Sequence, residues 1–150
     1  MNLKSKILIS GSTGYIGNQI KYLISKEKII TIGSNKNNLI NFNFSSNLKK
    51  KIPEIRNIDT FIHLELRNET YFKKNPFLSY QENLNSIKNA IFICKKNQIK
   101  TFVYLSTVHL YNKKQKIISE DSEVNCDNFY ELSHFTNEAI IKLNFQNSNT

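Results

Sequence analysis

Glycine is scarce in this chain of 150 residues, and several other residue types are scarcer still. The chain contains four glycines, two prolines, two cysteines and no tryptophan. Neither Cys94 nor Cys126 has a second Cys or His at a metal-ligand spacing, so we expect reduced thiols, no disulfide framework and no metal site. A chain of this length buries about two thirds of its unfolded surface without such cross-links.

Long hydrophobic runs are missing as well. The apolar stretch that follows the basic N-terminus covers only residues 7–9, which is too short for the core of a secretory signal peptide. No segment approaches the roughly 18 apolar residues of a transmembrane helix. The sequence therefore predicts a cytoplasmic protein that has no membrane partner.

Arginine is nearly absent, although the chain is basic. The formal net charge is +9, yet only Arg56 and Arg67 are arginines and the other basic residues are scattered lysines. Arginine is the residue favoured for bidentate contacts with phosphates and guanine. We interpret the charge as solvated surface and expect no nucleic-acid partner; a basic nucleic-acid binder is the alternative that rests on charge alone.

Short apolar runs alternate with segments of helical periodicity. The runs predict strands at residues 6–10, 29–32, 39–44, 60–66 and 101–105. Helices are predicted at residues 14–25, at 47–55, in a long segment after Pro76 and at 129–143. This alternation predicts an α/β fold with a doubly wound, Rossmann-like parallel sheet of about five strands. We expect one domain over residues 1–145 and a frayed tail over 146–150.

Two of the predicted helices have apolar faces that we expect to be buried. After Pro76, the predicted buried stripe is Tyr80, Leu84, Ile87, Ile91 and Cys94. Over residues 129–143, the predicted apolar face is Leu132, Phe135, Ala139 and Leu143.

Three of the four glycines lie where the first predicted strand gives way to the first helix, a position typical of a dinucleotide-binding loop. Gly11 allows the tight turn, Gly14 lets the backbone approach a pyrophosphate, and Gly17 lets helix and strand pack closely. The helix N-terminus supplies N–H donors to the phosphates. A glycine turn without a ligand is the alternative. The cofactor-binding residues predicted in this loop are Gly11, Thr13, Gly14, Tyr15, Ile16 and Gly17.

An acidic residue is missing where such a protein usually has one. A free ribose 2′-hydroxyl usually meets an Asp or Glu about 20 residues after the fingerprint begins, and no acid lies between Lys28 and Pro53. Ser34, Asn35 and Lys36 occupy that region instead. A lysine beside hydroxyl and amide donors suits the 2′-phosphate of NADP, so the sequence favours NADP slightly over NAD. An ordinary solvated Lys36 is the alternative.

Further motifs follow in the order of one known family. They are the glycine spacing Gly-x-x-Gly-x-x-Gly, the strand Asp-Thr-Phe-Ile-His-Leu at 59–64, Asn83, the segment 102–107 with Tyr111, and Tyr130. This ordered set resembles the extended short-chain dehydrogenase/reductases, the NAD-dependent epimerase/dehydratase family, which works largely on nucleotide sugars. The resemblance covers the chain from Lys6 to about Leu143.

The resemblance implies a catalytic set of Thr107, Tyr130 and His134. Thr107 would hydrogen-bond the substrate hydroxyl, and Tyr130 would exchange its proton as the acid/base during hydride transfer. The family's Tyr-x-x-x-Lys is Tyr-x-x-x-His here, so His134 would replace the lysine that holds the nicotinamide ribose and stabilises the phenolate. A neutral imidazole stabilises a phenolate less than a permanent cation does, which predicts a weakened site.

The resemblance also extends the cofactor-binding set to Asn43, Phe44 and Leu64, together with Tyr130 and His134. Glu65 and Leu66 stand where family members have two small residues. A carboxylate there is expected to oppose a bound cofactor unless it is turned away.

Each catalytic candidate also has a structural alternative. A tyrosine on an amphipathic helix is often a half-buried core residue, and Thr107 can simply cap a turn after a strand. We expect His63, at the end of a buried strand, to be a satisfied core histidine. Asn83 is expected to satisfy backbone groups near the fourth strand.

Family members run to about twice this length, so the resemblance implies a truncated chain that lacks the C-terminal substrate-binding part. The fifth strand would then form a sheet edge, which predicts a homodimer. The expected function is that of an NAD(P)-dependent epimerase, dehydratase or reductase acting on a small molecule such as a nucleotide sugar. The alternative is a catalytically weak or inactive dinucleotide-binding module or regulator.

Overall fold

The computed structural model describes residues 6–47 and 52–146, which form two compact units. The first unit contains the described residues up to Leu66 together with Asn85–Leu105. The second contains Arg67–Leu84 and the described residues from Ser106 onward. Among the described residues there is no helix with the length and apolar character needed to cross a membrane.

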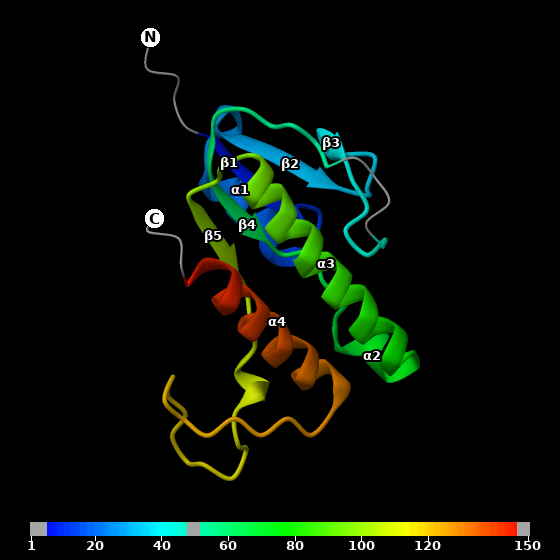
Figure 1. Ribbon diagram of the computed structural model, residues 1–150, viewed down its shortest axis with the longest axis vertical. Helices are drawn as coiled ribbons and strands as arrows, with labels where there is room; N and C mark the ends of the chain where they lie inside the picture. The colour runs from blue at the N-terminus through cyan, green and yellow to red at the C-terminus, as the bar shows by residue number, and fades with distance from the viewer. Residues whose placement is uncertain (1–5, 48–51, 147–150) are drawn as a thin grey trace. The chain divides into compact units, whose positions relative to one another are not determined.

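The first unit is built on one sheet of five parallel strands (Figure 1). The strands are β1 (Lys6–Ser10), β2 (Ile29–Gly33), β3 (Ile40–Asn41), β4 (Ile58–His63) and β5 (Thr101–Tyr104). Their order is β3-β2-β1-β4-β5, and every pairing is parallel. The chain moves outward from β1 in one direction and then in the other, which confirms the predicted doubly wound α/β fold.

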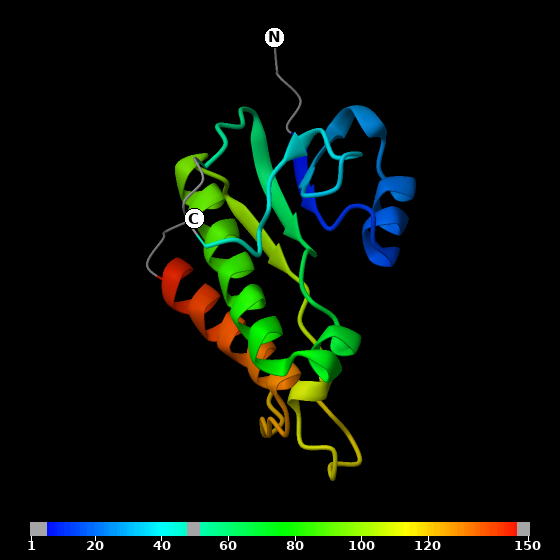
Figure 2. The same cartoon turned by 90° about the vertical axis from the view of Figure 1, so that its right-hand side faces the viewer.

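Helices cover both faces of this sheet. The helix α1 (Tyr15–Leu23) lies on one face, and the C-terminal half of α3 (Pro76–Lys96) lies on the other (Figure 2). The predicted stripe is confirmed in that half, because Ile87, Ile91 and Cys94 are buried. Right-handed crossovers from a shared central strand place successive helices on opposite faces in this way.

Two asparagines, Asn89 on α3 and Asn97 directly after it, bind main-chain groups of segments that have little regular structure. Asn89 Nδ2 donates to the carbonyl oxygens of Phe44 and Ser46, at 2.7 and 3.0 Å. Asn97 accepts from the Ile55 N–H at 2.6 Å and donates to the Pro53 carbonyl oxygen at 3.1 Å. These amides satisfy backbone groups that no strand pairs.

Some predicted boundaries were wrong. The strand predicted at 39–44 is reduced to two residues, and the Phe44 carbonyl oxygen accepts from Asn89 instead of from a strand. The predicted 60–66 strand starts at Ile58 and ends at His63. No helix forms over residues 52–55, and 48–51 lie outside the described residues, as does the predicted tail from 147 onward.

The second unit contains α2 (Glu69–Lys74), which the sequence analysis missed, the short helix η2 (Val108–Leu110) and α4 (Phe129–Phe145). The predicted apolar face of α4 was wrong. Leu132, Phe135 and Leu143 are 39%, 42% and 73% exposed, and Ala139 is exposed too. The residues that α4 buries are Glu131, Ser133, His134 and Asn137. Hydrogen bonding explains the inversion, since Ser133 Oγ accepts from Asn83 Nδ2 at 3.1 Å.

Strand β5 lies at the edge of the sheet, as predicted. Its Val103 is 42% exposed. A strand at the edge of a sheet is where a second chain could add a strand. The homodimer itself stays a prediction.

Candidate functional site

The glycine loop joins the carboxyl end of β1 to α1. Gly11 has a positive φ of 65°, and its carbonyl oxygen accepts from the Gly14 N–H at 3.0 Å. A Cβ at Gly11 would lie 2.7 Å from the carbonyl carbon of Leu64, so both the conformation and the space require glycine. Gly17 is buried, and a Cβ there would overlap the Gly11 carbonyl oxygen and lie 2.7 Å from Ser12 Cα. The predicted tight turn and close packing are therefore present.

The N-terminal end of α1 is open. Gly14 is its N-cap, no side chain of the described residues caps it, and its first turn contains no acidic residue. A Cβ at Gly14 would meet only the Gly11 carbonyl oxygen, at 3.3 Å. Thr13, Tyr15 and Ile16 are exposed. Unsatisfied N–H groups at an open helix N-terminus fit a phosphate, so the residues present suit the diphosphate of a dinucleotide.

The turn after β2 is tied to this loop. Ser34, Asn35 and Lys36 are all exposed there. Asn38, whose N–H donates to the Asn35 carbonyl oxygen at 3.0 Å, accepts from Ser12 Oγ at 2.8 Å. The structure therefore brings the predicted Ser34–Asn35–Lys36 segment and the glycine loop to the same carboxyl edge of the sheet.

The remaining predicted cofactor residues of the first unit are Asn43, Phe44 and Leu64, and not all of their side chains are accessible to a ligand. Phe44 is fully buried, with its ring 5.0 Å from that of His63, so its side chain belongs to the core. Asn43 is exposed, and its Oδ1 accepts from the Ser45 N–H at 3.1 Å. Leu64 presents its main-chain carbonyl to Gly11. Of the three, Asn43 alone presents an exposed side chain.

His63 is a satisfied core histidine, as predicted. Its Nδ1 lies 2.7 Å from Ser10 Oγ and its Nε2 lies 3.0 Å from Ser86 Oγ. Ser10 Oγ accepts from the Leu64 N–H, and Ser86 Oγ donates to the Glu65 carbonyl oxygen at 2.6 Å. Burial lowers the pKa of His63 to about 3, so the ring is neutral. The three side chains fix the backbone of Leu64 and Glu65 at the carboxyl end of β4.

In the second unit, a reciprocal cap fixes the start of α4 and hence the position of Tyr130. The Glu131 N–H donates to Asn128 Oδ1 at 3.0 Å, and Glu131 Oε2 accepts from the Asp127 N–H at 2.6 Å. This arrangement resembles a capping box, in which side chain and backbone satisfy each other across the first turn. Tyr130 therefore lies in a first helical turn that these two hydrogen bonds hold in place.

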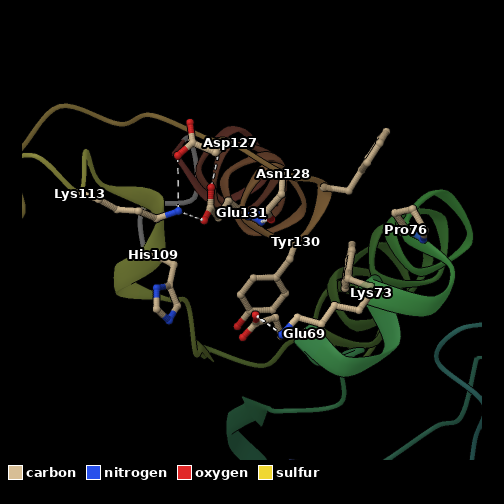
Figure 3. Close-up of a pocket in the computed structure, with 11 residues that line it drawn as sticks. Glu69, Lys73, Pro76, His109, Lys113, Asp127, Asn128, Tyr130 and Glu131 are labelled. Atoms are coloured by element: carbon tan, nitrogen blue, oxygen red, sulfur yellow. Dashed lines mark hydrogen bonds and ion pairs between the residues drawn. The ribbon is translucent and has the colours of Figure 1, made fainter.

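Tyr130 lines a cavity of about 740 Å³. Its ring points into the cavity in Figure 3, and the ring of Phe72 from α2 packs 5.5 Å from it, edge to face. The ring of His134, one turn further along α4, lies 4.8 Å away. Burial lowers the pKa of His134 to about 4. His134 is therefore a neutral neighbour of Tyr130, as the sequence analysis expected.

Lys113 brings a positive charge to this cavity. Its Nζ lies 2.8 Å from Glu131 Oε1 and 3.4 Å from Asp127 Oδ2 (Figure 3). The hydrogen bond with Glu131 raises the pKa of Lys113. Burial alone would raise the pKa of Glu131, but the hydrogen bonds from Lys113 and the Asp127 N–H outweigh it and lower that pKa. Lys113 and Glu131 are therefore both ionised at neutral pH, and the Glu131 carboxylate offsets the charge of the Lys113 ammonium.

Thr107 has the capping role that we raised as its structural alternative. It is the N-cap of η2, and its Oγ1 accepts from the His109 N–H at 3.3 Å. The segment η2 packs against α4. An accepting hydroxyl still has a hydrogen to donate, so the cap leaves its predicted contact with substrate open.

Sequence reasoning missed Lys113, His109 and the whole of α2. The sequence does contain signals for the capping box of α4 and for the start of α2. Asn128-x-x-Glu131 fits the capping-box pattern, and Asn68 before a first-turn Glu69 is typical of a helix start. Asn83, in contrast, was predicted correctly. Its Oδ1 accepts from the Arg67 N–H at 2.6 Å, a backbone group shortly after β4.

Two known proteins are similar to this chain over about nine tenths of its length. An uncharacterised UDP-glucose epimerase of Bacillus subtilis is 25% identical over 167 residues, which cover 90% of this chain and 50% of the relative. A dTDP-D-glucose 4,6-dehydratase of Dictyostelium discoideum is 29% identical, over 91% of this chain and 35% of the relative. The chain thus spans half or less of these relatives.

A solved structure shows the same fold. The UDP-glucose 4-epimerase of Bifidobacterium longum, in complex with NAD⁺ and UDP, superposes with a TM-score of 0.75 at 18% identity, over 96% of this chain and 50% of the epimerase. The statistical model of one family, described as NAD dependent epimerase/dehydratase, matches residues 7–147. With a glycine loop after β1, a doubly wound sheet and Tyr130 at the start of α4, this chain belongs to the NAD dependent epimerase/dehydratase family.

Proposed function

We propose that this chain binds a nicotinamide dinucleotide and contributes the cofactor-binding part of an epimerase, dehydratase or reductase that acts on a nucleotide sugar. The observation that carries the proposal is the open N-terminus of α1 behind a loop in which Gly11 and Gly17 have no room for a side chain. The names of the two relatives, which contain UDP-glucose and dTDP-D-glucose, support a nucleotide sugar as the substrate class.

The proposed roles are divided between the two units. In the first, Gly11, Gly14 and Gly17 hold the diphosphate, with Thr13, Tyr15, Ile16, Asn43, Leu64 and the Phe44 main chain around them, and Ser34, Asn35 and Lys36 lie on the ribose side. In the second, Thr107 would donate a hydrogen bond to the substrate hydroxyl, and Tyr130 would exchange a proton with it. His134 would orient the Tyr130 ring and bond to the nicotinamide ribose. When bound, the dinucleotide supplies the hydride acceptor or donor.

Cofactor binding gives the first test. We expect the full chain to bind NAD in a calorimetric titration, and Gly14→Ala to weaken binding at least tenfold, since a Cβ there would occupy the space through which phosphates approach the N–H groups. Gly14 has a φ of −74°, which alanine adopts readily, so the thermal melting curve should hardly change. A wild-type chain that binds neither NAD nor NADP would overturn the proposal.

A second candidate function is a dinucleotide-binding module or regulator without turnover. The specific observation in its favour is His134, which is neutral where the family places a lysine cation. Such a module would bind the cofactor and leave a nucleotide sugar unchanged.

The variant His134→Lys separates the two functions. A cation one helical turn from Tyr130 stabilises a phenolate, so we expect this variant to raise hydride transfer from UDP-glucose or dTDP-glucose to NAD at least tenfold above wild type. Reduced nicotinamide can be followed by its absorbance. His134→Gln, neutral like the histidine, is the matched control and should show no gain. Binding without turnover in all three proteins would support the module instead.

A further inference from the structure

Glu65 reaches a position that its place in the sequence does not predict. It follows β4 directly, yet its Oε2 lies 2.7 Å from the point that a Cβ on Gly33 would occupy. Gly33 is the last residue of β2, and β1 runs between β2 and β4. The carboxylate therefore extends past the end of the central strand to the end of β2.

Polar groups surround the same point. The Nδ2 of Asn38 lies 2.8 Å from that Cβ position, and Asn38 Oδ1 accepts from Ser12 Oγ in the glycine loop. The fourth glycine of the chain thus leaves the space that these side chains occupy. Any other residue at Gly33 would displace the ends of the Glu65 and Asn38 side chains from these positions.

The main chain of Glu65 is held firmly. Its carbonyl oxygen accepts from Ser86 Oγ at 2.6 Å, and the preceding N–H of Leu64 donates to Ser10 Oγ at 3.1 Å. A fixed backbone restricts where a half-buried side chain can point, so less conformational entropy is lost when the carboxylate binds a ligand.

Glu65 also avoids the diphosphate site. A Cβ at Gly14 would have no atom of Glu65 within 4 Å. The carboxylate therefore lies at the end of β2 and does not fill the space beside Gly14 through which phosphates approach the N-terminus of α1.

We propose that Glu65 supplies, from the end of β4, the acid that is missing after β2, and that it accepts hydrogen bonds from the adenosine ribose hydroxyls of NAD. This inference rests on the proposed dinucleotide binding. It deepens that proposal, because a carboxylate at the ribose repels the 2′-phosphate of NADP and makes NAD the preferred cofactor. It also reverses the slight preference for NADP that the sequence analysis drew from Lys36.

Titration of the full chain with NAD, NADP and an NAD analogue lacking the adenosine 2′-hydroxyl tests the inference. We expect wild type to bind NAD at least tenfold more tightly than either of the others. Glu65→Gln should lose about tenfold or more in affinity for NAD, as expected for a hydrogen bond to a charged group, and should bind the deoxy analogue and NAD almost equally. Its affinity for NADP should rise.

Glu54→Gln is the matched control, because it removes an equal charge from the same unit at an exposed position. It should keep the wild-type preference. If wild type binds NAD and Glu65→Gln binds it equally well or better, or if wild type prefers NADP, the role of Glu65 is wrong while dinucleotide binding stands. If wild type binds no dinucleotide, both proposals fail together.

Discussion

Replacing Gly17 by alanine should lower the free energy of unfolding by about 3 kcal/mol, the upper part of the range for overpacked sites. The sign is opposite to the ordinary helix rule, under which alanine gains about 1 kcal/mol over glycine within a helix. The reason is local: a Cβ at position 17 would overlap the Gly11 carbonyl oxygen and press on Ser12 Cα, and both are backbone atoms that cannot rotate away. Urea denaturation followed by circular dichroism measures the change.

The matched control is Gln19→Ala, on an exposed position of the same helix. It should leave stability unchanged or raise it slightly. If Gly17→Ala behaved like this control, the close contact between α1 and the glycine loop would not exist in solution. Binding of NAD should be lost with Gly17→Ala, because the loop would have to shift.

Acidification from pH 7.5 to 4.5 should lower the free energy of unfolding by roughly 5 kcal/mol. Burial lowers the pKa of His63 to about 3 and that of His134 to about 4, from 6.5. Below pH 6.5 both histidines are therefore protonated in the unfolded chain but stay neutral in the folded chain. The free energy of unfolding falls by about 1.4 kcal/mol for each histidine with every pH unit of acidification. Urea midpoints measured across this pH range report the slope.

Variants assign the slope to individual rings. His63→Gln and His134→Gln should each remove about half of it. A stability that stayed flat between pH 6.5 and 4.5 would mean that neither ring is buried as the structure shows. Glu131, whose pKa is lowered, adds its own loss of stability only in more acidic solution.

The sheet and the glycine loop could be predicted because their signals are local. A β-branched run before Gly11 and a change to helical periodicity after it mark a strand, a turn and a helix without knowledge of any distant residue. The same holds for His63, which ends an apolar strand. Its burial follows from that position, although its partners Ser10 and Ser86 do not.

The buried face of α4 could not be predicted from such local signals. Periodicity assigns Leu132, Phe135 and Leu143 to the buried face, but Ser133 faces Asn83 and Glu131 caps the helix start. Hydrogen bonds between residues 50 positions apart have no period in the sequence. The position of the Glu65 carboxylate beside Gly33 could not be predicted either. It depends on the order of the strands in the sheet and on the absence of a side chain at Gly33.

The asparagines on α3 and directly after it have a consequence for how this chain tolerates change. Asn89 donates to the segment around Phe44, and Asn97 both accepts from the Ile55 N–H and donates to the Pro53 carbonyl oxygen. Asparagine weakens strands by propensity, but its amide here bonds main-chain groups that no neighbouring strand pairs. The strand β3 is two residues long, and α3 holds the segment after it in place by side-chain bonds instead of strand pairing, so the topology of the sheet does not depend on a long β3.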